Sequence, residues 1–129
     1  MSFTIYDEHT LRSVWTSLDS TSTPGTLTML QAGTLGARMD VLLAANNDVV
    51  DHIVFLDYGA AADDGRIGSV NVPARQGFDG TPALDVLAAM LPVSAAGITI
   101  AGNETVFVGT DDTLASGKVI SLVGSGGDF

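Results

Sequence analysis

Two histidines, His9 and His52, are the residues of this sequence best suited to acid–base or nucleophilic chemistry. His52 follows Asp51, as in half of a catalytic pair, but neighbouring residues of a strand point to opposite faces. No serine lies in a G-x-S-x-G turn, and the chain has no cysteine. The sequence therefore predicts no catalytic residue, and His52 is expected to lie half-exposed at the start of a strand.

Oxygen-rich clusters are the next candidates, because Ca²⁺ prefers carboxylate and carbonyl ligands. Three clusters of this kind occur: Asn46, Asn47 and Asp48; Asp63 and Asp64; Asp111 and Asp112. None has the alternating D-x-[DN]-x-[DN]-G spacing, so turn formation explains them without a metal. The glycine-rich stretches GTLGAR and GSGGDF lack the Lys and Ser/Thr of a phosphate loop. They are interpreted as a turn and a flexible end, and neither metal nor cofactor is expected.

The overall charge narrows the classes of partner. The 129 residues have a net charge of −10, with fifteen acids against five Lys and Arg. Such a chain repels phosphate backbones and anionic lipid, so neither nucleic acid nor membrane is expected as a partner. The acidic surface serves solubility or, as an alternative, includes a patch that docks on a basic partner. With 46% hydrophobic residues the chain can build one core.

The elements that must position these residues begin with a distinct N-terminal stretch. At 11–18 the spacing i, i+3, i+4 and i+7 predicts one stripe of a short amphipathic helix, with an extended arm as the alternative because SVWTSL also suits a strand. A Ser-, Thr-, Pro- and Gly-rich linker follows. Residues 1–23 are therefore predicted to form an arm or helix with a linker. Its stripe, a candidate contact surface for its own core or for a partner, consists of Leu11, Val14, Trp15 and Leu18.

Strand-like segments recur every ten residues or so across residues 24–129, separated by glycine-rich turns. The runs at 52–58 and 66–72 predict a hairpin, and we interpret it as the centre of the fold. Thr81 and Pro82 are expected to begin a short helix at 83–90. The sequence thus predicts a mainly β domain, an antiparallel sandwich or jelly roll of about seven to eight strands with one or two short helices.

The order of these segments resembles small proteins encoded with the structural genes of tailed bacteriophages. The matching stretches run from residue 24 to 129: TPGTLTMLQAGTLGARMDVLLAANND, DHIVFLDY, IGSVNVPARQGFDGTPALDVL, a GI-x-I strand, ETVFV and the ending GGDF. The resemblance implies a compact β-sandwich virion protein without catalytic residues. It further implies a protein made in the host cytoplasm that sits on the capsid surface, binds the major capsid protein and acts as a homotrimer, as a decoration protein does.

Two alternatives to a decoration protein remain open. One is a minor head–tail or tail component. The other is a glycan- or receptor-binding β-sandwich, for which an exposed aromatic ring near Asp or Asn is needed. Phe78, in a glycine-rich loop beside Asp79, is the candidate contact for that role.

Overall fold

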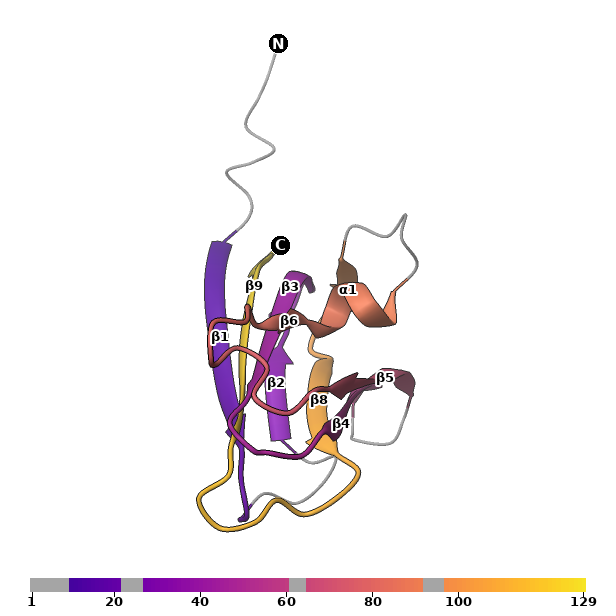
Figure 1. Ribbon diagram of the computed structural model, residues 1–129. Coiled ribbons are helices and arrows are strands. Elements are labelled where there is room, and N and C mark those ends of the chain that lie inside the picture. The colour runs from indigo at the N-terminus through magenta and orange to yellow at the C-terminus, as the bar shows by residue number, and fades with distance from the viewer. Residues whose placement is uncertain (1–9, 22–26, 61–64, 92–96) are drawn as a thin grey trace.

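A computed structural model describes residues 10–21, 27–60, 65–91 and 97–129. In these residues the chain forms two antiparallel sheets that lie face to face, with one short helix beside them (Figure 1). The predicted mainly β antiparallel sandwich with a short helix is confirmed. Seven of its strands have five or more residues, and two further strands are only two and three residues long.

The first sheet has the order β1-β9-β3-β6, and β7 also pairs with β3. Its strands are β1 (Thr10–Leu18), β3 (Ala37–Asn46), β6 (Leu84–Asp85), β7 (Ile98–Ile100) and β9 (Ile120–Asp128). The second sheet has the order β2-β8-β4-β5. Its strands are β2 (Leu27–Gln31), β4 (His52–Gly59), β5 (Arg66–Val72) and β8 (Thr105–Thr110). Every pairing is antiparallel.

Alternate residues of the long strands fill the space between the sheets, as the two-residue period of a strand requires. The first sheet contributes Leu42, Ala44 and Leu122, and the second contributes Val54, Leu56, Val106 and Val108, all fully buried. Helix α1 (Val86–Met90) packs against β3 and β5 and buries Val86 and Leu87. Its N-cap is Asp85, whose side chain accepts from the backbone N–H of Ala88 at 3.1 Å, so the expected start at Thr81 and Pro82 is wrong.

The amphipathic helix predicted at 11–18 is wrong, and the extended alternative holds. Thr10–Leu18 is strand β1, which pairs with β9 along its whole length from Thr10↔Asp128 to Leu18↔Ile120. Nine residues with helical spacing form a strand because β9 offers them a ladder of backbone hydrogen bonds that a nine-residue isolated helix cannot match. Leu18, at the end of this strand, is buried in the core between the sheets.

The predicted hairpin is confirmed as the pair β4–β5, but not as the centre of the fold. β5 is an edge strand, and β4 lies between it and β8. Cover for the outer face of β4 comes from β5 at two residues, because the Arg66 guanidinium lies 4.0 Å above the ring of Phe55 and its Nε contacts Asp57 Oδ1 at 2.5 Å. Phe55 and Asp57 are thereby buried on the outer face of the sheet.

The ending GSGGDF is not a flexible end, because its residues 124–128 are the last five residues of β9, which lies between β1 and β3. Glycine is required there. A Cβ at Gly126 would lie 1.9 Å from the backbone oxygen of Arg38, so β3 and β9 approach too closely for any side chain at this position. The approach coincides with a shift of register in β3 between Met39 and Val41.

Candidate partner-binding face

The four residues of the predicted N-terminal stripe are divided between two faces by the strand that carries them. Val14 and Leu18 have even numbers and point inward, where Leu18 is fully buried and Val14 packs against the core. Trp15 has the opposite parity and is 77% exposed on the outer face. Leu11 lies in β1 opposite Gly127, and its side chain is outside the described residues. Of the three stripe side chains that are described, Trp15 alone is available to a partner.

Trp15 stands in a row that crosses three strands of the first sheet. Its Cα partner in β9 is Val123, whose own partner in β3 is Leu43. All three are exposed large hydrophobic residues. In β6 the row continues from Leu43 to Asp85, whose carboxylate accepts from the Ala88 N–H, and within β1, β9 and β3 the rows on either side carry no charge. The nine residues of this outer face, named the A-face below, are Ser13, Trp15, Ser17, Val41, Leu43, Ala45, Ser121, Val123 and Ser125.

The absence of charge distinguishes the A-face in a chain with a net charge of −10. Its polar members are serines, which cost less to remove from water than carboxylates do. At one end, beyond Val41, the face is bounded by an ion pair between Arg38 Nε and Asp40 Oδ1 at 2.6 Å. An uncharged, partly apolar face with an exposed tryptophan is suited to a protein–protein contact, because tryptophan is enriched among the residues that dominate binding energy.

Segment 73–83 bounds the opposite end of the A-face. The backbone N–H of Asn46 donates to the Gln76 carbonyl at 2.8 Å, which ties the segment to the end of β3. Gly77 then passes over Ala45, since a Cβ at Gly77 would lie 2.7 Å from the Cβ of Ala45. With φ at +85°, Gly77 also adopts a conformation that other residues resist. Figure 1 shows this segment crossing the sheet between β5 and β6.

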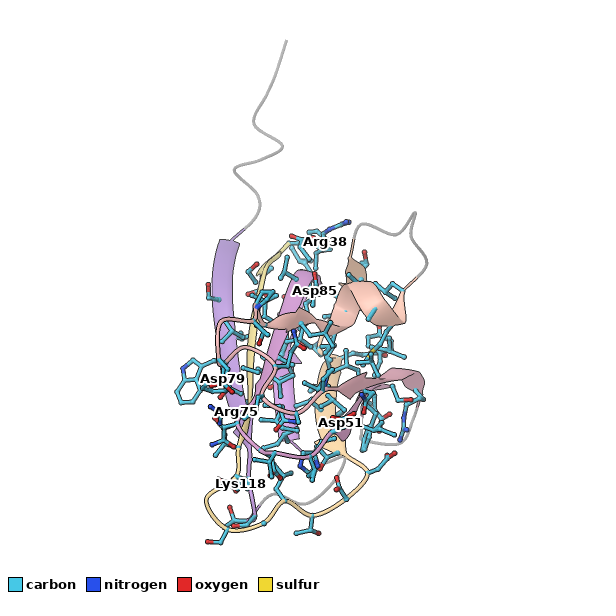
Figure 2. The ribbon with its side chains drawn as sticks, viewed as in Figure 1. Arg38, Asp51, Arg75, Asp79, Asp85 and Lys118 are labelled. Atoms are coloured by element: carbon cyan, nitrogen blue, oxygen red, sulfur yellow. The ribbon has the colours of Figure 1, made fainter. Side chains whose placement is uncertain are left out.

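Phe78, the candidate glycan platform, lies in the same segment and is partly exposed. One face of its ring is occupied, because the Arg75 guanidinium lies 5.0 Å from the ring centroid. Arg75 is held there by two hydrogen bonds to Asp79, at 2.9 and 3.1 Å, and by one to the Asn47 carbonyl at 2.9 Å. Figure 2 shows Arg75 and Asp79 together in this segment. The arrangement fastens the loop and leaves less of the ring for a sugar.

His52 is buried, so the expectation of a half-exposed histidine is wrong. Its side chain is enclosed by two carboxylates from different loops: Nε2 lies 2.8 Å from Asp48 Oδ2, and Nδ1 lies 3.1 Å from both oxygens of Asp112. Burial lowers the pKa of His52, but the hydrogen bonds to Asp48 and Asp112 outweigh burial and raise the pKa above its ordinary value. The sequence signal was weak, because Asp112 is sixty positions away along the chain.

The neighbouring Asp51 has no part in this cluster. It accepts hydrogen bonds from the Ala74 backbone N–H at 2.8 Å and from the Asn71 side chain at 3.1 Å, and these hold its pKa below the ordinary value. The carboxylates of Asp48 and Asp112 approach opposite nitrogens of the His52 ring and do not converge on a common point. Within the described part of the chain, no group of three or more His, Cys, Asp or Glu residues could hold a metal ion. Asp63, Asp64 and His9 lie outside that part.

Sequence reasoning missed Leu43 and Val123 as surface residues. The alternation Ser121, Val123, Ser125 along β9 was a usable signal, but the glycines that follow it favoured a flexible end. A helix able to cross a membrane is not found among the residues that the structure describes.

Comparison with protein families and with curated proteins finds no match. Among solved structures, the chain is similar to the cryo-EM structure of the virus-like particle of extra small virus from the giant freshwater prawn Macrobrachium rosenbergii. The two chains are 15% identical, and the match covers 95% of this chain and 80% of that one with a TM-score of 0.40. This likeness does not place the chain in a family.

Proposed function

We propose that this protein is a non-enzymatic structural component of a tailed-phage particle, namely a decoration protein that binds the major capsid protein on the outside of the shell. The observation that carries the proposal is the A-face, a sheet surface without charge and with Trp15 exposed at its centre row. The ordered resemblance of residues 24–129 to small phage virion proteins supports it from the sequence.

The charge distribution suits such a role. Free copies carry a net charge of −10 and repel one another, so they stay dispersed before they are recruited. None of the nine A-face residues is a carboxylate, and the adjacent Asp85 already accepts from the backbone N–H groups of Leu42 and Ala88. Contact with the shell therefore buries Trp15 and its apolar neighbours at little electrostatic cost. The nine residues of the A-face give one copy only a modest affinity for the shell. The proposal therefore includes a homotrimer, in which three linked contacts multiply the affinity.

Mass spectrometry of purified virions tests the proposal. A decoration protein should be present in hundreds of copies, in a fixed ratio to the major capsid protein. A minor head–tail or tail component would be present in about a dozen copies or fewer. Absence from the particles would refute any virion role, and a low copy number would refute the decoration role alone.

A further inference from the structure

Three exposed aliphatic side chains lie within five positions of the chain, at the connection from β3 to β4. Val49 is 71% exposed, Val50 is 53% exposed and Ile53, near the start of β4, is 41% exposed. They are named the valine tip below. Single exposed hydrophobic residues are ordinary, but three within five consecutive positions, two in the loop and one near the start of β4, require an explanation. The hydrogen bonds of this loop provide one.

The loop is held from inside by the buried side chain of Asn46. Its Nδ2 donates to the carbonyls of Val50 at 3.0 Å, Val72 at 3.2 Å and Pro73 at 3.3 Å. Its Oδ1 accepts from the backbone N–H of Asp48 at 2.9 Å. One fully buried amide thus fixes the backbone on both sides of Val49.

Asp48 adds a second set of constraints. Its Oδ1 accepts from the backbone N–H of Val49 at 2.7 Å, and its Oδ2 contacts His52 Nε2 at 2.8 Å. Its carbonyl accepts from the Arg75 N–H at 3.0 Å. The valine tip is therefore anchored to β4 and to segment 73–83 as well as to β3.

Loop 111–119 is locked against the same region. Asn47 exchanges backbone and side-chain hydrogen bonds with Val119, at 3.1 and 2.7 Å, and its Nδ2 donates to the Gly117 carbonyl at 3.4 Å. Asp112 contacts His52 Nδ1, and the Asp111 N–H donates to the Ile53 carbonyl at 3.3 Å. The two loops form one hydrogen-bonded unit at the end of the sandwich.

A loop that only connects two strands does not need buried polar side chains to fix its backbone with its apolar side chains exposed to solvent. Buried Asn46, Asp48 and His52 must each satisfy their hydrogen bonds at an entropic cost, and the result is a fixed loop that exposes two adjacent valines. Fixing a contact residue beforehand lowers the entropy lost on binding. The arrangement is that of a preorganised docking element.

Charge around the valine tip defines the complementary partner. Asp51, Asp111 and Asp112 are exposed on the same two loops, and hydrogen bonds keep the pKa of Asp51 low, so it stays ionised. Figure 2 shows Asp51 and Lys118 near the end of the molecule opposite Arg38. Lys118 is the one basic residue of these two loops, so the carboxylates outnumber it and the complementary partner offers an apolar pocket bordered by Lys or Arg. A second copy, with five Lys and Arg against fifteen acids, offers few such residues.

We propose that the valine tip is a second contact with the capsid shell, in which Val49, Val50 and Ile53 enter an apolar pocket bordered by basic residues of the major capsid protein. This inference rests on the proposed function and deepens it. It assigns the apolar A-face and the acid-bordered valine tip to two different contacts, with different dependence on salt.

The test uses purified shells that lack this protein, the full-length chain and a sedimentation assay of binding. The variant V49S/V50S should bind about a hundredfold more weakly, about tenfold for each buried valine side chain lost. The matched control is Leu35→Ser, because Leu35 is 77% exposed on another turn. Its binding should equal that of the wild type. Circular dichroism and melting temperature confirm that each variant is folded.

A second variant keeps both valines and changes only the rim. Asp111→Lys should weaken binding at low salt by repelling the basic border, and the difference from wild type should shrink as salt is raised. If wild type binds shells while V49S/V50S and Asp111→Lys bind as tightly, the valine tip is not a contact, and the decoration role stands. If wild type itself does not bind, both proposals fall.

Discussion

His52 and Asp48 form a buried pair in which the ring Nε2 lies 2.8 Å from a carboxylate oxygen, while the other ring nitrogen faces Asp112. An ionised carboxylate can only accept a hydrogen bond, so in the protonated form of His52, which its raised pKa favours, each ring nitrogen donates to one carboxylate. A cation enclosed by two carboxylates from separate loops joins the β3–β4 connection to the loop that precedes β9. It makes the end of the sandwich that carries the valine tip sensitive to pH.

The stability of the fold should decline as the pH rises above 6.5, the ordinary pKa of His52. The folded pKa of His52 lies above its ordinary value of 6.5, so its stabilisation is complete below that value and is lost as the pH rises through the folded pKa. The pKa of Asp48 is lowered, chiefly by the hydrogen bond from His52, so its contribution is complete above 3.8 and is lost as the pH falls through its folded pKa. In urea denaturation, the contribution of this pair to the free energy of unfolding should therefore be largest between pH 3.8 and pH 6.5.

His52→Gln provides the control for that pH dependence. The variant should have a lower free energy of unfolding than the wild type at weakly acidic pH. Its free energy of unfolding should change little as the pH rises above 6.5. His9→Gln removes the other histidine of the chain and leaves the Asp48, His52 and Asp112 contacts in place, so it should keep the wild-type profile. Equal slopes for His52→Gln and wild type would show that groups other than His52 set the pH dependence.

Trp15→Ser should weaken attachment to the shell without unfolding the protein. Trp15 is exposed in the first sheet, so its loss leaves no cavity, but a central aromatic contact is typically worth about 2 kcal/mol or more, which is roughly thirtyfold in affinity. Sedimentation with undecorated shells measures the change. Because the A-face carries no charge, the ratio of wild-type to variant affinity should not vary with salt. Unchanged binding would remove the A-face from the contact.

Gly126→Ala should destabilise the first sheet by more than about 1 kcal/mol, because its Cβ would strike the Arg38 carbonyl and force β3 and β9 apart. Gly33→Ala is the matched control, since the nearest atom to its Cβ is 4.0 Å away. Thermal melting of the two variants gives the comparison. Equal melting temperatures would mean that the strands separate at negligible cost.

Arg66→Met should destabilise the protein more than Asp57→Asn does. Asp57 is buried in β4, Arg66 Nε contacts one of its oxygens, and the other has no hydrogen-bond partner within the described structure. Loss of Arg66 leaves a buried carboxylate unpaired, which costs about 1.5–3 kcal/mol, and also uncovers Phe55. Urea denaturation of both single variants and the double variant measures the coupling. If Arg66→Met is the milder change, solvent or another group satisfies Asp57.

Several features of the fold follow from local sequence. The run Ile53–Val54–Phe55–Leu56 has no polar face, which predicts cover on both sides, and the structure buries all of it except Ile53. Glycine-bounded turns at ten-residue intervals allow little but a mainly β domain. The hairpin of β4 and β5 is a local pairing, and it was predicted correctly. The absence of a G-x-S-x-G turn or of cysteine is likewise a property of the sequence alone.

Tertiary structure decided what depends on partners far along the chain. The spacing of Leu11, Val14, Trp15 and Leu18 fits a helix and a strand equally, and only pairing with β9, more than a hundred residues away, selects the strand and turns Trp15 outward. The same strand shows why GSGGDF is ordered: its glycines permit a close approach that no local pattern reveals. His52 is enclosed because Asp112, which lies in loop 111–119, contacts its ring Nδ1. Strand pairing and buried charge are non-local, so they could not be read from neighbouring residues.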